Sequence, residues 1–317
     1  MSPPAPRPGA AVSVGVFDGV HLGHARILER ARECAAPRGR CAVVSFDPHP
    51  DLVLARSFRA PAPLTPLPER RKRIAALGIS EMEVVPFTRE LAALEPEDFV
   101  VRYLVGSYQP HSLVVGEGFA LGRGRSGDVE RLRAIGARHG FEVVAVPLLV
   151  IDGGPVSSTR IRALLETGRV AEAARLLGRC YGLEGRVVPG EGLGRALGYP
   201  TANLRLHEEK LVPGDGVYAA WARLEGAPGR LPAAVSIGQR PTFDGREQAL
   251  EAHLLDWEGD LLGRDLDVEL VDWIRPQVRF ENGAALVAAM DRDVSEVRWR
   301  LASVPPPRGE PPGRGRR

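Results

Sequence analysis

VSVGVFDGVHLGH, residues 12–24, opens with an apolar run that stops at Asp18 and Gly19. Apolar residues at helical spacing follow at once, so the pattern predicts a buried strand, a tight turn and then a helix. The turn would deliver His21 and His24 to the first turn of that helix. We therefore expect this strand, turn and helix to form the central part of the first domain.

The start of this predicted helix is suited to anions. Backbone N–H groups in a first helical turn lack a partner within the helix and carry a partial positive charge, which favours phosphate. Gly23 leaves no side chain between His21 and His24, so a ligand could approach the backbone closely. Two imidazoles there could donate hydrogen bonds to oxygens that gain charge during phosphoryl or nucleotidyl transfer. Two neighbouring histidines can equally be a solvated helix start or the ligands of an adventitious metal.

Composition sets the broad class. A chain of 317 residues has room for two domains, and its 44% hydrophobic and 26% charged residues are ordinary for a soluble globular protein. The formal net charge of +2 argues against general attraction to nucleic acid or membranes, but it allows a local anion site. Cys34, Cys41 and Cys180 lack metal-type spacing, and their odd, small number fits a reducing cytoplasm. Residues 1–10 form a proline-rich leader without the apolar core of a secretory signal.

Strands and helices alternate through the first half. We expect strands at 41–46, 83–85, 112–115 and 142–146, and helices at 68–77, 96–104 and 128–139. This alternation predicts an α/β domain with a doubly wound parallel sheet, which binds ligands beyond the carboxyl ends of its strands.

The second half of the chain has a different sequence pattern. Short β-like segments at 182–188, 217–224, 233–237, 249–255 and 266–273 are separated by turns with no helices between them. That is the pattern of a small antiparallel barrel, closed by a helix from 283–290 toward Arg300. A helix at 170–177 ends at Gly178, which places the domains at 11–178 and 181–304. The Pro/Gly/Arg-rich segment 305–317 is expected to be a disordered tail.

Two loops of the first half could bind a polyphosphate. The prolines of FDPHP, residues 46–50, would hold His49 in a rigid turn, although the segment could be only a stiff loop. Glycines including Gly116, together with Arg123 and Arg125, make residues 114–128 a cationic loop able to follow phosphates. A solvated loop is the plain alternative for such a composition.

A serine-rich helix start offers a second anion site. Ser157 or Ser158 is a natural N-cap, and Thr159 and Arg160 add a hydroxyl and a positive charge. Ordinary capping would explain this segment if it stood alone.

These stretches together resemble one known family. GVFDGVHLGH matches the G-x-F-D-x-x-H-x-G-H signature of the nucleotidylyltransferase superfamily, and it most resembles bacterial bifunctional riboflavin kinase and FMN adenylyltransferase enzymes, also called FAD synthetases. FDPHP is similar to the family's F-E-P-H-P, with Asp47 in place of Glu. SSTRIR is similar to S-S-T-x-[IV]-R. The resemblance spans roughly residues 10–300.

Three segments of the second half extend the resemblance. GYPTAN, residues 198–203, matches G-[FY]-P-T-A-N, and SIGQRPTF, residues 236–243, is similar to N-I-G-x-x-P-T-F with Ser236 in place of Asn. The preceding glycines give no Rossmann fingerprint because no helix follows, so we expect a flap over phosphates formed by Gly192, Gly194 and Gly198. EAHLLDWEGDLLG, from Glu251, is similar to E-x-H-[IL]-x-[DN]-[FW]-x-x-D-L-Y-G, with Leu262 for Tyr.

The resemblance implies a fold and two activities. It implies an N-terminal nucleotidylyltransferase domain, and a C-terminal antiparallel β-barrel that phosphorylates riboflavin with Mg²⁺ and ATP. Glu251 would be the catalytic base, with the metal at Thr201 and Asn203, whose oxygens suit Mg²⁺. Along a strand, Glu251, His253 and Leu255 would share one face, with Ala252 and Leu254 on the other, and the Glu251 carboxylate would face the barrel mouth. A surface strand residue is the plain reading of that glutamate.

The first domain would adenylylate FMN to FAD. His21, His24, Ser158, Thr159 and Arg160 would stabilise the reacting phosphates. Further contacts to ATP or phosphate would come from Gly15, Phe17, Asp18, Gly23, Gly116, Arg123, Arg125 and Ser157. Riboflavin, FMN and ATP would be the partners, without nucleic acid or membrane, and the oligomeric state is left open.

One departure from the family pattern bears on this function. Gly118 stands where the family usually has Asn or Asp before Phe119. A riboflavin kinase with a degenerate adenylyltransferase domain is therefore an alternative, and a flavin- or nucleotide-binding regulatory module without turnover is another.

Overall fold

The computed structural model describes residues 9–35, 39–54, 62–190, 192, 194, 197–226, 229–242 and 245–304, with the backbone alone at 240–242 and 245–247. The expected tail, 305–317, and most of the leader lie outside these residues. The chain divides into two compact units between Ser158 and Thr159. This division assigns residues 159–178 to the second unit, and the domain bounds 11–178 and 181–304 stay a prediction.

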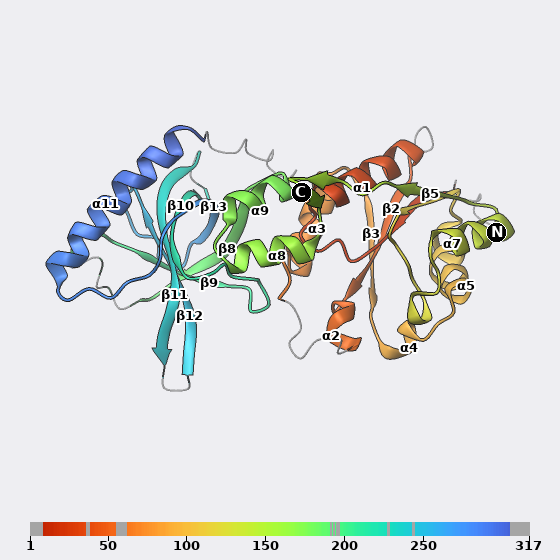
Figure 1. Ribbon diagram of the computed structural model, residues 1–317, viewed down its shortest axis with the longest axis horizontal. Helices are drawn as coiled ribbons and strands as arrows, with labels where there is room; N and C mark the ends of the chain where they lie inside the picture. Colours follow the sequence, from red (N-terminus) through yellow and green to blue (C-terminus); the bar gives the residue numbers. More distant parts are fainter. Residues whose placement is uncertain are drawn as a thin grey trace, which may run out of the picture. The chain divides into compact units, whose positions relative to one another are not determined.

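The first unit is built on a parallel sheet with strand order β3-β2-β1-β4-β5 (Figure 1). Its strands are β1 (Ala11–Val14), β2 (Cys41–Asp47), β3 (Glu81–Pro86), β4 (Ser112–Gly116) and β5 (Glu142–Val146). Adjacent residues of β1 pack into two different clusters, Val12 with Leu104 and Leu132, and Ala11 with Leu28 and Ile74. The predicted doubly wound parallel sheet is confirmed, because apolar cores cover both of its faces.

The helices follow the predicted order. They are α1 (Leu22–Ala35), α2 (Pro50–Leu54), α3 (Leu67–Ala76), α4 (Arg89–Ala92), α5 (Pro96–Phe99), a π-helical segment (Val100–Val105), α6 (Gly106–Tyr108) and α7 (Val129–His139). Asp128 caps α7 by accepting a hydrogen bond from Arg131 N at 2.9 Å. A 3₁₀ turn (Arg123–Arg125) lies in the segment expected to be a cationic loop, and a small hairpin, β6 (Val150–Ile151) and β7 (Gly154–Pro155), follows β5 without having been predicted.

The second unit is a closed barrel with strand order β10-β11-β12-β9-β8-β13 (Figure 1). Its strands are β8 (Tyr181–Val188), β9 (Ala202–Leu206), β10 (Gly216–Leu224), β11 (Leu231–Thr242), β12 (Gly245–Leu254) and β13 (Asp265–Arg275). The predicted antiparallel barrel is confirmed. Strand β9 was not predicted, because glycines and a proline precede it and only five residues form it.

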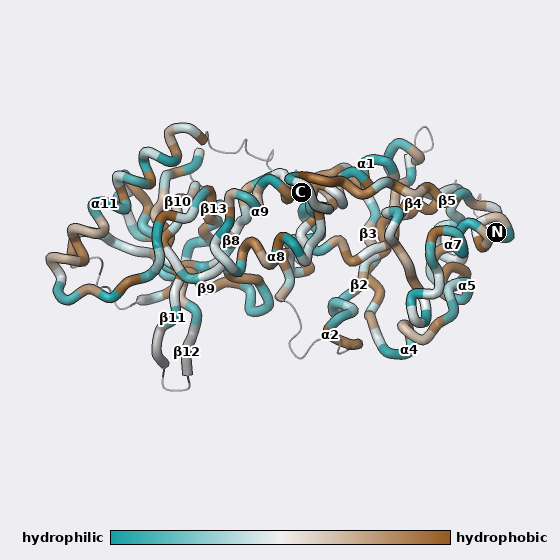
Figure 2. The backbone as a smooth tube through the Cα atoms, in the orientation of Figure 1, coloured by the Kyte–Doolittle hydropathy of each residue, from teal (hydrophilic) through white to brown (hydrophobic). Residues whose placement is uncertain are grey.

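Among its described residues, the second half of the chain has the helices α8 (Ser158–Glu166), α9 (Val170–Leu177) and α11 (Gly283–Ala302). Helix α11 packs Val297 and Leu301 against Ala219 and Val271 of the barrel wall. Figure 2 shows hydrophobic colour along the strands and hydrophilic colour recurring along the outer helices. Among the described residues, we find no helix with the length and apolarity needed to cross a membrane.

Strand β12 alternates as predicted. Leu250, Ala252 and Leu254 are buried, whereas Glu251 and His253 on the other face are partly exposed. The strand ends at Leu254, so Leu255 no longer belongs to the face of Glu251; it is buried against α11.

Two candidate active-site cavities

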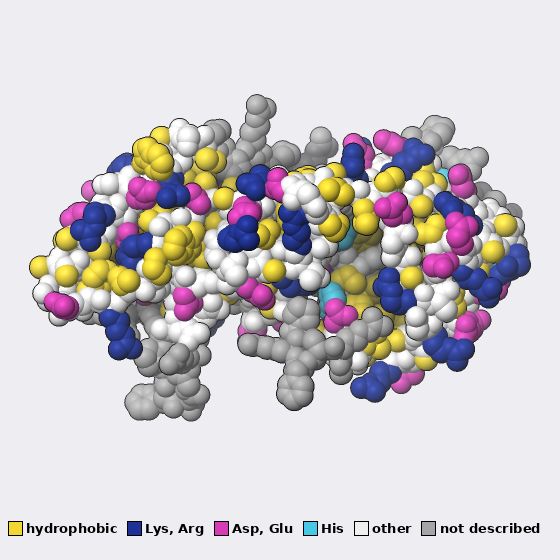
Figure 3. Space-filling model, in the orientation of Figure 1, with side chains coloured by type: hydrophobic (Ala, Val, Ile, Leu, Met, Phe, Trp, Pro, Cys, Tyr) yellow, Lys and Arg dark blue, Asp and Glu magenta, His cyan; other side chains and the backbone are white. Residues whose placement is uncertain are grey.

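A cavity of about 560 Å³ opens at the carboxyl ends of β1, β2 and β4. We call it the sheet cavity. The predicted site residues that line it are Gly15, Phe17, Asp18, His24, Gly116, Arg125 and Ser158. Figure 3 shows histidine and hydrophobic side chains together in a hollowed part of this unit's surface. The topology therefore brings together motifs that are more than 140 residues apart, as parallel strands require.

The turn after β1 is tighter than the sequence indicates. The strand stops at Val14, and Phe17 (φ 55°) and Val20 (φ 41°) take left-handed conformations that are uncommon for such residues. The Phe17 ring folds back on Gly15, where a Cβ atom would lie 3.1 Å from that ring. Each such residue costs on the order of 1–3 kcal/mol, so surrounding contacts must hold the turn in place.

Asp18 supplies several of those contacts. Its carboxylate is buried and accepts hydrogen bonds from Leu64 N (3.1 Å) and Thr65 N (2.9 Å). The Thr65 hydroxyl lies 3.2 Å from the same carboxylate and accepts from Gly19 N at 2.8 Å. Ser158 Oγ donates to the Asp18 carbonyl at 2.9 Å, which ties the last residue of the first unit to the turn.

The two histidines are stacked rather than spread around the cavity. Their ring centroids are 3.6 Å apart with 15° between the planes, and His24 N donates to His21 Nδ1 at 3.2 Å. His24 lines the cavity, while His21 is buried behind it. A Cβ atom on Gly23 would lie 3.1 Å from the His21 ring. The glycine therefore makes room for the imidazole, and the expected close approach of a ligand stays a prediction.

The remaining predicted residues of the sheet cavity lie in several environments. Arg125 donates to the Gly118 carbonyl at 3.2 Å, whereas Arg123 forms an ion pair with Glu95 away from the lining. Ser157 immediately precedes α8, the position expected of an N-cap. Thr159 and Arg160 belong to the second compact unit.

Gly118 lines the sheet cavity with open space around it. A Cβ atom built there would meet nothing within 4 Å, and its φ is not left-handed. An asparagine at this position would therefore fit without strain.

Two further features border the sheet cavity or support it. His49, which the sequence left as either a site residue or part of a stiff loop, lines the cavity, and its Nδ1 accepts from Asp51 N at 3.2 Å. Residues 64 and 65 and helix α3 support the turn from behind, and no motif marked them, because Thr65-Pro66 reads as an ordinary helix start.

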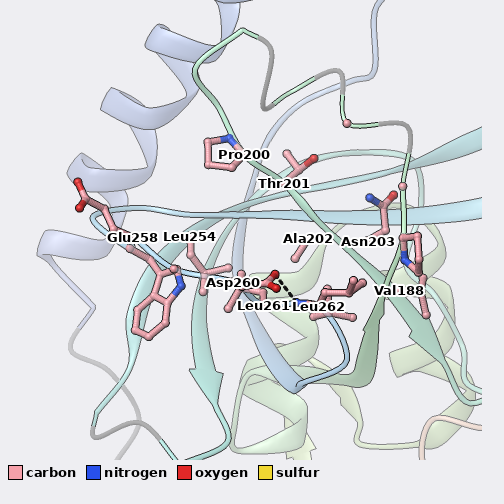
Figure 4. Close-up of a pocket in the computed structure, with 16 residues that line it drawn as sticks. Val188, Pro200, Thr201, Ala202, Asn203, Leu254, Glu258, Asp260, Leu261 and Leu262 are labelled. Carbon is pink, nitrogen blue, oxygen red and sulfur yellow. Dashed lines mark hydrogen bonds between the residues drawn. The ribbon is translucent and has the colours of Figure 1, made fainter.

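The second unit holds a cavity of about 690 Å³, which we call the barrel cavity. Of the predicted residues, Gly192, Thr201 and Asn203 line it, and Gly190, which was not among them, lines it too. Figure 4 shows Thr201 directly before strand β9 and Asn203 on it, with Asp260, Leu261 and Leu262 on another loop that lines the cavity. Gly194 and Gly198 do not line it; the Gly194 carbonyl accepts from Leu197 N and Tyr199 N in a tight turn.

Glu251 does not line this cavity but is hydrogen-bonded to Thr201, which does. The Thr201 hydroxyl donates to Glu251 Oε2 at 3.0 Å, and Asn203 is the register partner of Glu251 across β9 and β12. A Cβ atom on Gly190 would lie 1.9 Å from Asn203 Nδ2, so glycine is required beside this amide. A hydroxyl, an amide and a carboxylate thus gather at the cavity edge.

These donors fit Mg²⁺ in chemical type. Mg²⁺ prefers oxygen ligands and takes only one or two from protein when phosphates and water supply the rest. Because the Thr201 hydroxyl donates its hydrogen bond to Glu251, the lone pairs of the hydroxyl oxygen remain for a cation. No cluster of three or more His, Cys, Asp or Glu that could hold a metal occurs within the described part of the chain, so phosphate oxygens would have to complete the coordination.

Exposed contacts hold the loops of the barrel cavity. His253 Nδ1 lies 2.9 Å from the Pro200 carbonyl, and the Tyr199 ring packs on His253. Tyr199 OH bonds to Asp291 of α11, which raises the pKa of the phenol. Asp256 pairs with Arg298 of the same helix at 2.7 Å.

Comparisons with known proteins agree with this division. The FAD synthetase family model matches residues 4–160, and the riboflavin kinase family model matches residues 177–301. The bifunctional riboflavin kinase/FMN adenylyltransferase of Listeria monocytogenes is 35% identical over 92% of this chain and 93% of its own length. That of Escherichia coli is 38% identical over 91% and 92%. A solved structure named macrolide-efflux protein, from Streptococcus pneumoniae, has a TM-score of 0.84 and 30% identity over 92% of this chain and 94% of that chain.

Proposed function

The chain belongs to the family of bifunctional riboflavin kinases/FMN adenylyltransferases, and on that premise we propose how its residues divide the two reactions. The barrel is the riboflavin kinase domain and the parallel-sheet unit carries the FMN adenylyltransferase domain, with ATP as co-substrate of both. The roles of individual residues are our proposal.

In the barrel cavity, the ribityl 5′-hydroxyl of riboflavin attacks the γ-phosphorus of ATP. Glu251 accepts the hydroxyl proton, the bond to the β–γ bridging oxygen breaks, and FMN and ADP result. Thr201 and Asn203 hold the metal and the phosphates, and Gly192, Gly194 and Gly198 belong to the flap above them. When bound, Mg²⁺ supplies positive charge to the β- and γ-phosphates. The observation that carries this assignment is the 3.0 Å bond between Thr201, on the cavity wall, and Glu251.

In the sheet cavity, an FMN phosphate oxygen attacks the α-phosphorus of ATP. The bond to the α–β bridging oxygen breaks, and FAD and pyrophosphate leave. No protein nucleophile is needed, so catalysis is positioning and electrostatic stabilisation. His24 donates to the reacting phosphate from the cavity wall, and His21 stacks behind it to fix its ring.

The remaining predicted residues bind phosphates or shape that site. Gly15, Phe17, Asp18 and Gly23 form the turn around the histidines, and Gly116, Arg123 and Arg125 provide the cationic loop. Ser157, Ser158, Thr159 and Arg160 form the second anion site. The N–H groups in the first turn of α8, which have no partner within the helix, support this role.

The alternative of a kinase with a degenerate first domain is not favoured. Its basis was Gly118, yet the FAD synthetase model matches residues 4–160 and the bifunctional relatives align over more than nine-tenths of this chain. We also propose a cytoplasmic location, since all three cysteines are free thiols.

Product analysis tests the assignment. The purified protein is incubated with riboflavin, ATP and Mg²⁺, and riboflavin, FMN and FAD are separated by chromatography. We expect FMN first and FAD after it. FMN that accumulates without FAD, even when FMN and fresh ATP are supplied, would contradict the role of the sheet cavity. Absence of both products would support a binding module.

A further inference from the structure

We propose that Arg70 is a positioning residue for adenylyl transfer. It fixes two loops that form walls of the sheet cavity in position relative to each other. This inference rests on the proposed function of that cavity. Arg70 lies in the second turn of α3 and does not line the cavity itself. Its guanidinium lies behind the cavity wall, and none of the signature motifs includes it.

The contacts of Arg70 join segments that are far apart in the sequence. Its Nη1 donates to the Val16 carbonyl at 2.8 Å, and its Nη2 donates to Asp47 Oδ1 at 3.3 Å. Val16 belongs to the turn after β1, and Asp47 ends β2, directly before the segment that places His49 on the cavity wall. One rigid fork therefore spans the two loops on which the reacting phosphates would rest.

The bond to Val16 is placed where the turn is most strained. The Val16 carbonyl belongs to the same peptide group as the nitrogen of Phe17, whose φ is 55°. Ser45 Oγ also donates to this carbonyl, at 3.1 Å. Fixing that oxygen fixes the orientation of the peptide plane, and the turn then carries His24 to its place in the wall. Arg70 acts on the histidine through the backbone.

The burial of Arg70 indicates a built site. Only 4% of the residue is exposed, and its Nε has no hydrogen-bond partner. Burial lowers the pKa of Arg70, while the carboxylates of Asp18 and Asp47 oppose that shift. Charged arginine is rarely buried unless its fork is used, because desolvation is costly. The two arginines that follow it most closely on α3, Arg71 and Arg73, make other contacts: Arg71 donates to the Met82 carbonyl, and Arg73 pairs with Glu69 at 2.7 Å.

Arg70→Met removes the guanidinium but keeps a side chain of similar length. Arg70→Lys keeps the positive charge, but its single ammonium group can make only one of the two hydrogen bonds, to Val16 or to Asp47. The assay follows FAD formation from supplied FMN and ATP, and FMN formation from riboflavin is the control in the same molecule. We expect kcat for FAD formation to fall about 10- to 100-fold in Arg70→Met, because small misplacements at a reacting centre have effects of that size. KM for FMN and ATP should change less than kcat, since the lining side chains remain. Arg70→Lys should recover part of kcat, and FMN formation should stay at the wild-type rate in both variants.

Arg73→Met is the matched control on the same helix, and it should leave FAD formation unchanged. The proposal is overturned if Arg70→Met forms FAD at the wild-type rate, if Arg73→Met loses it equally, or if FMN formation is lost together with FAD formation. It is also overturned if Arg70→Met raises KM with kcat unchanged, or if Arg70→Lys recovers nothing. Absence of FAD from the wild-type protein would instead contradict the proposed function.

Discussion

The histidine turn of the sheet cavity and the loops of the barrel cavity are held by different kinds of contact. Asp18, Thr65 and Arg70 support the turn from the buried side, where Asp18 is 3% and Thr65 1% exposed. The barrel loops are held from outside, by Tyr199 to Asp291 and by Asp256 to Arg298. Both outer partners lie on α11.

This difference has an energetic meaning. A buried donor left without its partner costs about 1–3 kcal/mol, whereas an exposed ion pair contributes about 0–1 kcal/mol. The turn is therefore preorganised, and the strain at Phe17 and Val20 is maintained because several buried bonds fix it. Exposed contacts of this kind cost little to break, which would suit the flap over phosphates proposed for the barrel. If the two sites are independent, a substitution in one should leave the activity of the other unchanged.

The largest effect is expected for Glu251→Gln. It keeps an oxygen that can accept from Thr201 but cannot take the hydroxyl proton, so FMN formation should fall about 10²- to 10⁴-fold. FAD formation from supplied FMN should be unchanged. Glu258→Gln, on the same cavity wall, is the control. A fully active kinase in Glu251→Gln would remove this residue from the role of base.

His24→Ala tests the opposite site. Loss of one donor to the developing charge should lower FAD formation about 10²- to 10³-fold and spare FMN formation. His207→Ala, an exposed histidine of the barrel unit, should leave both activities intact. An equal loss of FMN and FAD formation in His24→Ala would argue against two independent sites.

The sequence was sufficient for the parts of these sites that lie within one motif. The order of the elements, the alternation of β12 and the start of α1 follow from local pattern, since each depends on neighbouring residues. Arg70 and Thr65 could not be found this way, because their roles come from contacts to residues 23 to 54 positions away in the chain, at Asp47, Gly19 and Val16. Strand β9 was missed because its short run is defined by pairing with β8 and β12 rather than by its own composition.

Thr65→Val measures the buried support of the turn. It preserves side-chain shape but leaves Gly19 N without its acceptor and Asp18 with one donor fewer. We expect the first unit to lose about 1–3 kcal/mol of unfolding free energy, with lower FAD formation. Thermal unfolding followed together with each activity should show earlier loss of FAD formation while FMN formation persists. Unchanged stability would show that the turn does not depend on this bond.

Gly118→Asn examines the open space in the sheet cavity. An amide there adds a hydrogen-bonding group without strain, because a Cβ atom meets nothing within 4 Å. One added neutral hydrogen bond is worth about 1 kcal/mol, so KM for ATP or FMN should fall roughly fivefold. Gly118→Ala adds the Cβ atom alone and should leave KM unchanged. A rise in KM with asparagine would show that the wild-type cavity needs this space.

The smallest effect is expected at the outer support of the barrel loops. Arg298→Met removes the partner of Asp256 and should raise the kinase KM for ATP about two- to threefold at low ionic strength, and less in high salt, because exposed charges are screened. Arg298 holds the pKa of Asp256 below its usual range, so the pair contributes above the ordinary aspartate pKa and is lost as pH falls through the lowered value. The difference in KM between wild type and Arg298→Met should therefore vanish on acidification. If the difference in KM persists at high salt and low pH, α11 holds the loop at Asp256 by packing and not by charge. In that case the barrel loops would not be held mainly by exposed ion pairs, and only the buried support of the turn would distinguish the two cavities.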